Sequence, residues 1–134
     1  MNPLKDEIKV FSLPVHTDKR GALAVSEFDD LPFDPKRAYF LYDTKAIRGG
    51  HAHVKEEEVF VCVAGNFRAR VHDGKKWRSI LMNKPGKALY TGAMIWHEFD
   101  HFSKNSIMLA LSSTSYEGTK DYILDFDQFK QQSK

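Results

Sequence analysis

The sequence predicts an all-β domain, a β-sandwich or small barrel, with one short helix at its C-terminal end. Short apolar runs recur along the 134 residues, turn residues separate these runs, and only the tail shows helical periodicity. Many short strands at close spacing are typical of sandwiches and barrels. We predict strands at Ile8–Leu13, Ala22–Phe28, Arg37–Asp43, Glu58–Val63, Phe67–Val71, Trp77–Met82, Ala88–Thr91, Met94–Phe99 and Ile107–Ser112.

The turns and the patterns inside the runs support these elements. The segment His72-Asp73-Gly74-Lys75 predicts a tight hairpin turn, because glycine accepts a positive φ without steric cost. Glu58–Val63 is apolar on both faces, as expected for a central strand. Phe67–Val71 alternates apolar and basic residues, which predicts one buried face and one polar face. The tail Asp125–Gln132 has Phe126 and Phe129 three residues apart, so we predict a helix there.

Composition indicates one soluble domain over residues 1–134. Apolar residues make up 42% and charged residues 28%, and no apolar run approaches the roughly 20 residues that span a bilayer. The charged N-terminal segment does not resemble a signal peptide, and the single cysteine, Cys62, suits a reducing compartment. The net charge of +2, with no basic block, argues against general nucleic-acid binding. We therefore expect a cytoplasmic protein with neither a membrane nor a nucleic acid as partner.

The segment that carries most chemical information runs from Gly49 to Glu58. Because residues two apart in a strand point to the same face, His51 and His53 should project together. A carboxylate, Glu58 or Glu57, follows, and His97 comes after a glycine turn further along. Imidazoles and a carboxylate in this arrangement suit a divalent metal, and they also suit a polar cavity that moves protons.

This spacing resembles the cupin pattern of HxH, Glu, Gly and a later His. The wider context resembles the WxcM-like nucleotide-sugar 3,4-ketoisomerases, cupins that act on dTDP-4-keto-6-deoxyglucose. The similar segments cover almost the whole chain: Asp18–Leu23, Pro32-Phe33, Lys36–Phe40, Arg48–His53, Val61–Gly65, Trp96–Glu98, Tyr116 and Asp121–Ile123. The chain departs from that family at Phe40, where a second Tyr is common, and at Glu57-Glu58, where Glu-Gln is usual.

The resemblance implies a cupin-type jelly-roll barrel that moves a sugar ketone from C4 to C3. It assigns His51 as the leading base, His53 as its partner in proton handling or positioning, and Tyr39 as a hydrogen-bonding or proton-shuttling group. An imidazole suits this work because its ordinary pKa, about 6.5, lies near neutrality. The reaction is an internal rearrangement through an enediol or enediolate with no net oxidation, so we expect no cofactor and no metal.

Substrate binding and assembly follow from the same resemblance. Arg20, Arg37 and Arg48 fall inside family-like segments and could grip the diphosphate, since a guanidinium matches phosphate geometry. His97 would line the sugar site, and Trp96 or Tyr116 could hold the thymine. The family pairs subunits by exchanging N-terminal strands, so we expect a homodimer in which Ile8–Leu13 adds to a partner's sheet edge.

Other functions stay open at this point. A metal-dependent cupin would use His51, His53, Glu58 and His97 as ligands. A non-catalytic cupin would bind a nucleotide sugar without reaction, and a 3,5-epimerase would use the same class of substrate. For the ketoisomerase, we expect an aminotransferase to convert the product into a 3-amino sugar for surface glycans such as lipopolysaccharide O-antigen or S-layer glycan.

Overall fold

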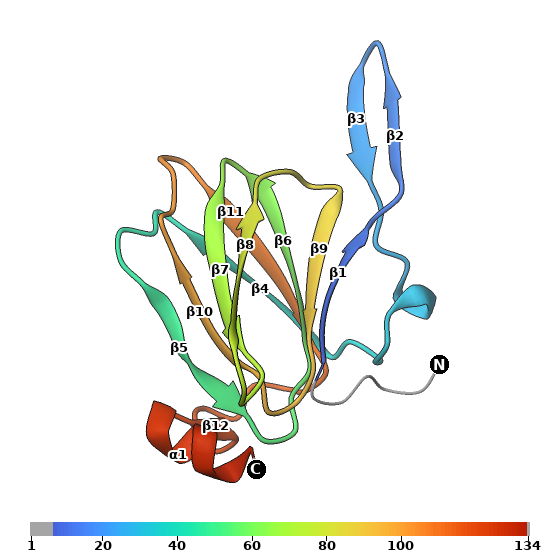
Figure 1. The fold of residues 1–134 in the computed structure, drawn as a ribbon. Coiled ribbons are helices and arrows are strands. Elements are labelled where there is room, and N and C mark those ends of the chain that lie inside the picture. The colour runs from blue at the N-terminus through green and yellow to red at the C-terminus, as the bar shows by residue number, and fades with distance from the viewer. Residues whose placement is uncertain (1–6, 134) are drawn as a thin grey trace.

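Two five-stranded sheets face each other and form a barrel in the computed structural model, which describes residues 7–133 (Figure 1). The first sheet has the order β1 (Ile8–Ser12), β9 (Lys87–Thr91), β6 (Glu58–Ala64), β11 (Ile107–Ser112) and β4 (Arg37–Tyr42). The second has the order β12 (Tyr122–Ile123), β5 (Arg48–His53), β10 (Trp96–Asp100), β7 (Phe67–His72) and β8 (Trp77–Met82). With the helix α1 (Phe126–Gln132), this confirms the predicted all-β class with a short C-terminal helix.

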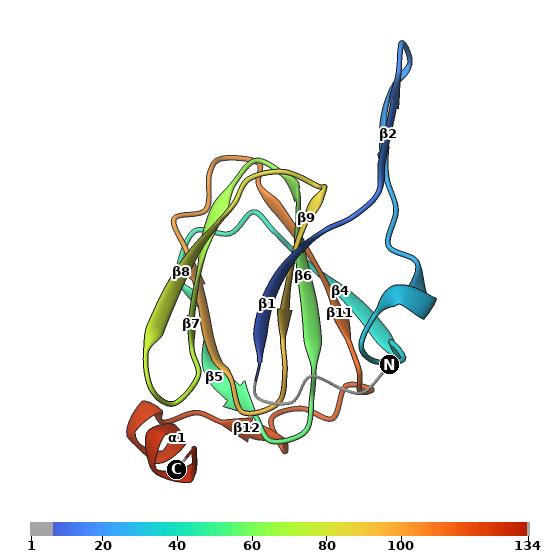
Figure 2. The same cartoon turned by 45° about the vertical axis from the view of Figure 1, so that its right-hand side comes forward.

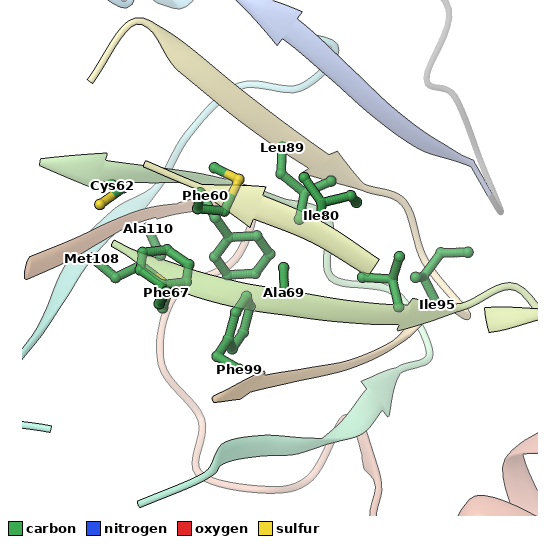
Figure 3. Packing of buried hydrophobic residues seen from close by; sticks show 12 residues of the cluster. Phe60, Cys62, Phe67, Ala69, Ile80, Leu89, Ile95, Phe99, Met108 and Ala110 are labelled. Atoms are coloured by element: carbon green, nitrogen blue, oxygen red, sulfur yellow. The ribbon is translucent and has the colours of Figure 1, made fainter. Parts of the chain in front are cut away.

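The main core lies between the two sheets, where inward-facing side chains of both sheets interdigitate (Figure 3). Its aromatic centre is formed by Phe60, Phe67 and Phe99, and the ring centroids of Phe60 and Phe99 are 4.8 Å apart. Burying a side chain of this size contributes about 1.5–3 kcal/mol to stability. The core runs along the length of β7, from Phe67 to Val71, so it holds the two sheets together and supports the polar groups beside it.

Strand β6 is buried on both faces, as its sequence predicted. Phe60 and Cys62 point into the main core, whereas Val59 and Val61 point to the outer face. A second cluster covers that outer face with the segment around the 3₁₀ turn η1 (Phe28–Asp30), which brings Leu31 over the strand.

Strand β7 also follows its sequence pattern. Phe67, Ala69 and Val71 are buried, while the two arginines between them lie on the outer face. Arg68 forms a bidentate pair with Asp100 at 2.7 and 2.6 Å, and Arg70 lies 3.3 Å from Glu98. These are cross-strand pairs with β10, so both arginines have partners outside the barrel.

A hairpin of β2 (Val15–Asp18) and β3 (Gly21–Ala24) projects from the barrel (Figures 1 and 2). The predicted strand Ala22–Phe28 was too long, because the chain leaves the hairpin after Ala24 and Phe28 begins η1. Val15–Asp18 was missed, since a strand that packs against no core needs no apolar pattern. The predicted exchange strand, as β1, pairs with β9 of its own chain.

The helix α1 packs on the second sheet at one end of the barrel, beside β12 (Figure 1). Asp125 caps its first turn by accepting a hydrogen bond from the backbone N–H of Gln128 at 2.8 Å. Phe129 is fully buried and packs with Trp96. His72 lies in the same aromatic cluster, where its Nδ1 accepts a hydrogen bond from the N–H of Gly74 at 3.0 Å.

One further strand limit differs from the prediction, and two strands were not predicted. Met94 has a positive φ of 61°, which is incompatible with a regular strand, so β10 begins at Trp96 rather than Met94. The segment Arg48–His53 was treated as extended but was not among the predicted strands, because its two glycines interrupt the apolar pattern that identifies a strand. The two-residue strand β12 is too short to show a pattern. Among residues 7–133, no helix is both long enough and apolar enough to cross a membrane.

Candidate active site

Three histidines of the second sheet meet inside the barrel. His51 pairs across the sheet with His97, and the ring centroid of His51 lies 4.7 Å from that of His97 and 4.8 Å from that of His53. The register of β5 against β10 shifts by one residue at Gly50, which forms a β-bulge beside the histidines. A Cβ at Gly49 would lie only 2.8 Å from the carbonyl oxygen of His97, so glycine permits this close approach.

Glu58, from the first sheet, lies beneath the histidines. Its Oε1 is 3.0 Å from Nε2 of His53 and 3.6 Å from Nε2 of His97. The hydroxyl of Tyr39, on β4, donates a short hydrogen bond to Oε2 of the same carboxylate. Glu57, the other candidate for this position, instead accepts a hydrogen bond from the hydroxyl of Tyr90 at 2.5 Å. The structure thus brings Glu58, and not Glu57, to the histidines.

Burial and the charges of neighbouring groups shift the pKa values of the histidines and of Glu58. Burial, helped by the neighbouring His53, lowers the pKa of His51 from 6.5 to about 4. Burial lowers the pKa of His97 to about 3, although Glu58 opposes the shift. For Glu58, burial favours a higher pKa, but the close imidazoles of His53 and His97 and the Tyr39 hydroxyl bring it down to about 2. At neutral pH, His51 and His97 are therefore uncharged beside a carboxylate.

A cavity of about 660 Å³ opens in front of this cluster. Five of the predicted site residues line its wall: two histidines, one tyrosine and two arginines. They are His51, His97, Tyr39, Arg37 and Arg48. Tyr116, the other candidate for a thymine contact, lines it as well and is 71% exposed. His53 is 3% exposed and lies behind the cavity wall, in contact with Glu58.

The two arginines of the cavity differ in their surroundings. Arg37 donates hydrogen bonds to Oε2 of Glu56 at 3.1 Å and to the Ser112 hydroxyl at 3.2 Å, so it belongs to an internal network. Its guanidinium carbon also lies 5.4 Å from the centre of the Tyr116 ring. Arg48 is exposed at the cavity and has no ion pair with any residue between 7 and 133.

Two predicted substrate contacts lie elsewhere in this chain. Arg20 is at the tip of the projecting hairpin, largely exposed, and pairs with Asp18 at 2.6 Å. Trp96 precedes His97 on β10 and so points to the opposite face, where it is buried against Phe126 and Phe129. Its indole N–H donates to Glu98 at 3.1 Å. The structure therefore places Trp96 in the packing of α1 rather than in the cavity.

Sequence reasoning missed three residues around the histidines. Glu56 is 4% exposed, and burial followed by the charge of Glu58 raises its pKa. Asp121 accepts hydrogen bonds from the backbone N–H groups of Lys55 and Glu56, which fixes the turn between β5 and β6. The Tyr122 ring stacks on His51. The run Glu56-Glu57-Glu58 gave no signal for which carboxylate is buried, and Tyr122 is distant from His51 in sequence.

The cluster also has the donor set of a transition-metal site. One nitrogen from each of His51, His53 and His97 lies within 4.8 Å of the others, and Glu58 is adjacent. Nδ1 of His53 is buried without a hydrogen-bond partner in residues 7–133, while its Nε2 faces Oε1 of Glu58 at 3.0 Å. Imidazole and carboxylate ligands fit a divalent metal, which would polarise a carbonyl as a Lewis acid.

The fold and the cavity define a cupin-type jelly-roll barrel with a histidine-lined site. Residues 6–134 match the family described as WxcM-like, C-terminal (FdtA), and this chain belongs to that family. The chain is 41% identical to TDP-4-oxo-6-deoxy-alpha-D-glucose-3,4-oxoisomerase from Aneurinibacillus thermoaerophilus, over 92% of this chain and 91% of that protein.

Solved structures agree with this family. A 3,4-ketoisomerase from Helicobacter canadensis superposes with a TM-score of 0.89 at 34% identity, covering 95% of this chain and 97% of the other. The sugar 3,4-ketoisomerase QdtA from Thermoanaerobacterium thermosaccharolyticum, solved in complex with TDP, also gives 0.89, at 29% identity and over 94% and 93% of the two chains. These relatives confirm the predicted enzyme class, a sugar-nucleotide 3,4-ketoisomerase.

Proposed function

We propose that this protein moves the keto group of dTDP-4-keto-6-deoxy-D-glucose from C4 to C3. The observation that carries the proposal is a neutral, half-buried imidazole, His51, on the wall of a cavity of about 660 Å³. The cavity volume falls within the range of roughly 300–1,000 Å³ typical of small-molecule sites. The TDP-sugar substrate of the curated relative supports the choice of substrate class.

His51 would act as the general base. Because its pKa is lowered to about 4, the ring is unprotonated at neutral pH and can accept the proton from C3. The electron pair of the C3–H bond then forms the C3–C4 double bond of an enediolate, and the C4 carbonyl oxygen takes the negative charge. The C3 hydroxyl proton then passes to the C4 oxygen. The C3 carbonyl forms as the electron pair of the double bond accepts a proton at C4, so there is no net oxidation.

The groups behind His51 would hold the catalytic geometry. His53 is fixed beside Glu58, and Tyr39 donates to the same carboxylate, so all three are ordered before substrate arrives. His97 faces the cavity opposite His51 across the strand pair and would contact the sugar. The rearrangement needs no redox cofactor, because both electrons stay in the substrate.

The diphosphate would be held by arginines. Arg48 is the exposed cation on the cavity wall, and Arg37 contributes positive charge from its internal network. Tyr116 offers an exposed aromatic face at the cavity for the thymine. The reaction would supply a 3-keto sugar to an aminotransferase in the synthesis of surface glycans.

A homodimer would give Arg20 a role that its own subunit does not offer. The hairpin carries Arg20 away from the barrel, and Leu23 on its second strand is 61% exposed. We propose that the hairpin packs on a second copy and brings Arg20 toward that copy's cavity. Light scattering should show a dimer for the wild type and a smaller particle for Leu23→Glu. A monomeric wild type contradicts the proposed dimer and leaves the proposed chemistry unaffected.

A metal-dependent reaction is the second candidate, favoured by the convergence of the three imidazoles beside Glu58. These four side chains would hold the ion, and His51 would then be a ligand rather than a base. Binding of a nucleotide sugar without turnover is the remaining alternative.

Incubation with dTDP-4-keto-6-deoxyglucose, followed by NMR of the product, tests the proposal. A 3-keto product supports it. In heavy water the C3 proton of the remaining substrate should exchange, because enediolate formation removes it, and the product carries no proton at C3. Recovery of unchanged substrate without exchange at C3 would leave a binding protein, and inversion at C3 or C5 would indicate an epimerase.

A further inference from the structure

The closest ring to His51 belongs to Tyr122, a residue with no role in the mechanism above. The two ring centroids are 4.4 Å apart and the planes differ by 19°, so the rings are stacked. Tyr122 also meets His53 edge-on, with centroids 4.4 Å apart at 89°. One tyrosine thus contacts both histidines of the HxH segment from the same side.

The backbone around Tyr122 is held firmly. In the β12–β5 pair, Tyr122 lies opposite His53 and Ile123 opposite Ala52. The N–H of Val54 donates to the carbonyl of Asp121 at 3.0 Å. Ile123 is 4% exposed and packs in the cluster under α1. The ring of Tyr122 is therefore presented to His51 from a fixed strand and not from a loose loop.

The His51 imidazole hydrogen-bonds the backbone of Gly49, and its ring neighbours are Tyr122, His53 and His97. One hydrogen bond leaves the ring free to turn about that contact, so the ring contacts contribute to its orientation. His53 and His97 lie nearly perpendicular to it, at 79° and 76°, whereas Tyr122 stacks against its face at 19°. An aromatic face against the imidazole limits the rotation of the ring. The ring nitrogens then stay directed parallel to the Tyr122 ring.

Tyr122 also separates two cavities. It lines the large cavity and a second one of about 290 Å³, and Arg37 is the other residue that both cavities share. A smaller side chain at position 122 would open the space behind His51 and leave one face of the imidazole uncovered. The aromatic ring, rather than the hydroxyl, is the part of Tyr122 that contacts His51.

We propose that Tyr122 is a positioning residue, whose ring holds the His51 imidazole in the orientation required for proton transfer. This inference rests on the proposed function, because it assumes that His51 is the base. A misplacement of about 1 Å can cost roughly 100-fold in rate, so the loss of the stack should appear in kcat.

The test compares Tyr122→Phe with Tyr122→Leu. The Phe variant keeps the ring and should keep most of the wild-type kcat, whereas the Leu variant should lose roughly 10- to 100-fold in kcat with the Kd for TDP unchanged. Ile123→Ala is the matched control: it weakens the same strand without touching His51, so it should lower the Tm but not kcat. If Tyr122→Leu does not fold, Tyr122→Met offers a flexible non-aromatic chain of similar length.

Two results would overturn the inference. An equal loss of kcat in the Phe and Leu variants would show that the hydroxyl, and not the ring, is required. A normal kcat in Tyr122→Leu would exclude the positioning role. If the wild type does not isomerise the substrate, the proposed function fails, but NMR of the His51 ring still tests the stack. Its protons should carry a ring-current shift in wild type and Tyr122→Phe that disappears in Tyr122→Leu, and an unchanged shift contradicts the contact.

Discussion

Nε2 of His53 lies 3.0 Å from Oε1 of Glu58, and the side chains of both residues are almost completely excluded from water. The two residues come from opposite sheets, β5 and β6. The other oxygen of Glu58 accepts the hydroxyl of Tyr39. The carboxylate is therefore a shared support for a histidine of one sheet and a tyrosine of the other.

The first prediction concerns this carboxylate. Glu58→Leu should lower the free energy of unfolding by about 1–3 kcal/mol for each buried polar group that loses its partner. Glu58→Gln should lose less, because its amide oxygen still accepts from Tyr39. Urea denaturation measures both, with Glu27→Gln as an exposed carboxylate control. A Glu58→Leu variant as stable as wild type contradicts the supporting role.

The second prediction concerns His51. His51→Asn should reduce turnover by about 10²–10⁴-fold, because the amide keeps hydrogen bonds but cannot accept the C3 proton. Binding of TDP, measured by calorimetry, should stay nearly unchanged. His101→Asn is the control, since His101 is exposed and asparagine tolerates its positive φ of 53°. Near wild-type turnover in a folded His51→Asn variant would exclude His51 as the base.

The third prediction concerns phosphate binding. Arg48→Ala should raise KM and weaken TDP binding by about tenfold, the lower end for a charge-assisted contact, because the side chain is exposed. Arg20→Ala should also weaken TDP, but only in the dimer, since Arg20 lies in the turn of the hairpin and does not line its own cavity. Calorimetry with TDP measures both variants. Unchanged affinity in both would place the diphosphate elsewhere.

The fourth prediction concerns stability in acid. Burial lowers the pKa of His72 below its ordinary 6.5, so the unfolded chain takes up a proton that the folded chain resists. The free energy of unfolding should therefore fall as the pH drops from about 7.5 to about 5. His72→Gln removes the titration and keeps an acceptor for the Gly74 N–H, so its stability should fall less over this range. Equal pH dependence in the two proteins would contradict the assignment.

The fifth prediction concerns metal. If the histidines must stay free to move protons, the protein should remain active after dialysis against EDTA. A bound ion would occupy the lone pairs that the mechanism needs. Loss of activity on chelation, with recovery on adding one divalent ion, would replace the proposed mechanism with the metal-dependent one.

The strands that contribute to the core could be predicted because burial imposes a pattern. Phe67, Ala69 and Val71 alternate with arginines, and β6 is apolar throughout, so period and hydropathy alone identify both strands. The hairpin strand Val15–Asp18 and the pair Tyr122–Ile123 could not be found this way. Neither segment has both the length and the burial that produce a periodic pattern.

In the candidate site, too, the features that follow from a local sequence pattern could be predicted and the others could not. The convergence of His51 and His53 follows from strand periodicity, and the position of His97 from the family resemblance. Trp96 was offered, with Tyr116, as an aromatic slot for the thymine, but it precedes the inward-facing His97 in the strand and so faces α1. The stack of Tyr122 on His51 depends on β12 pairing with β5, a contact between distant parts of the sequence that no local pattern reveals.

The division of the site between two sheets links its chemistry to the folding of the whole barrel. The histidines belong to one sheet and Glu58 and Tyr39 to the other, so neither sheet alone contains a supported base. A partly folded chain, with either sheet formed by itself, would have strands but no proton-transfer machinery. Catalytic competence should therefore arise in a single cooperative event, when the two layers close on each other, and no active folding intermediate is expected.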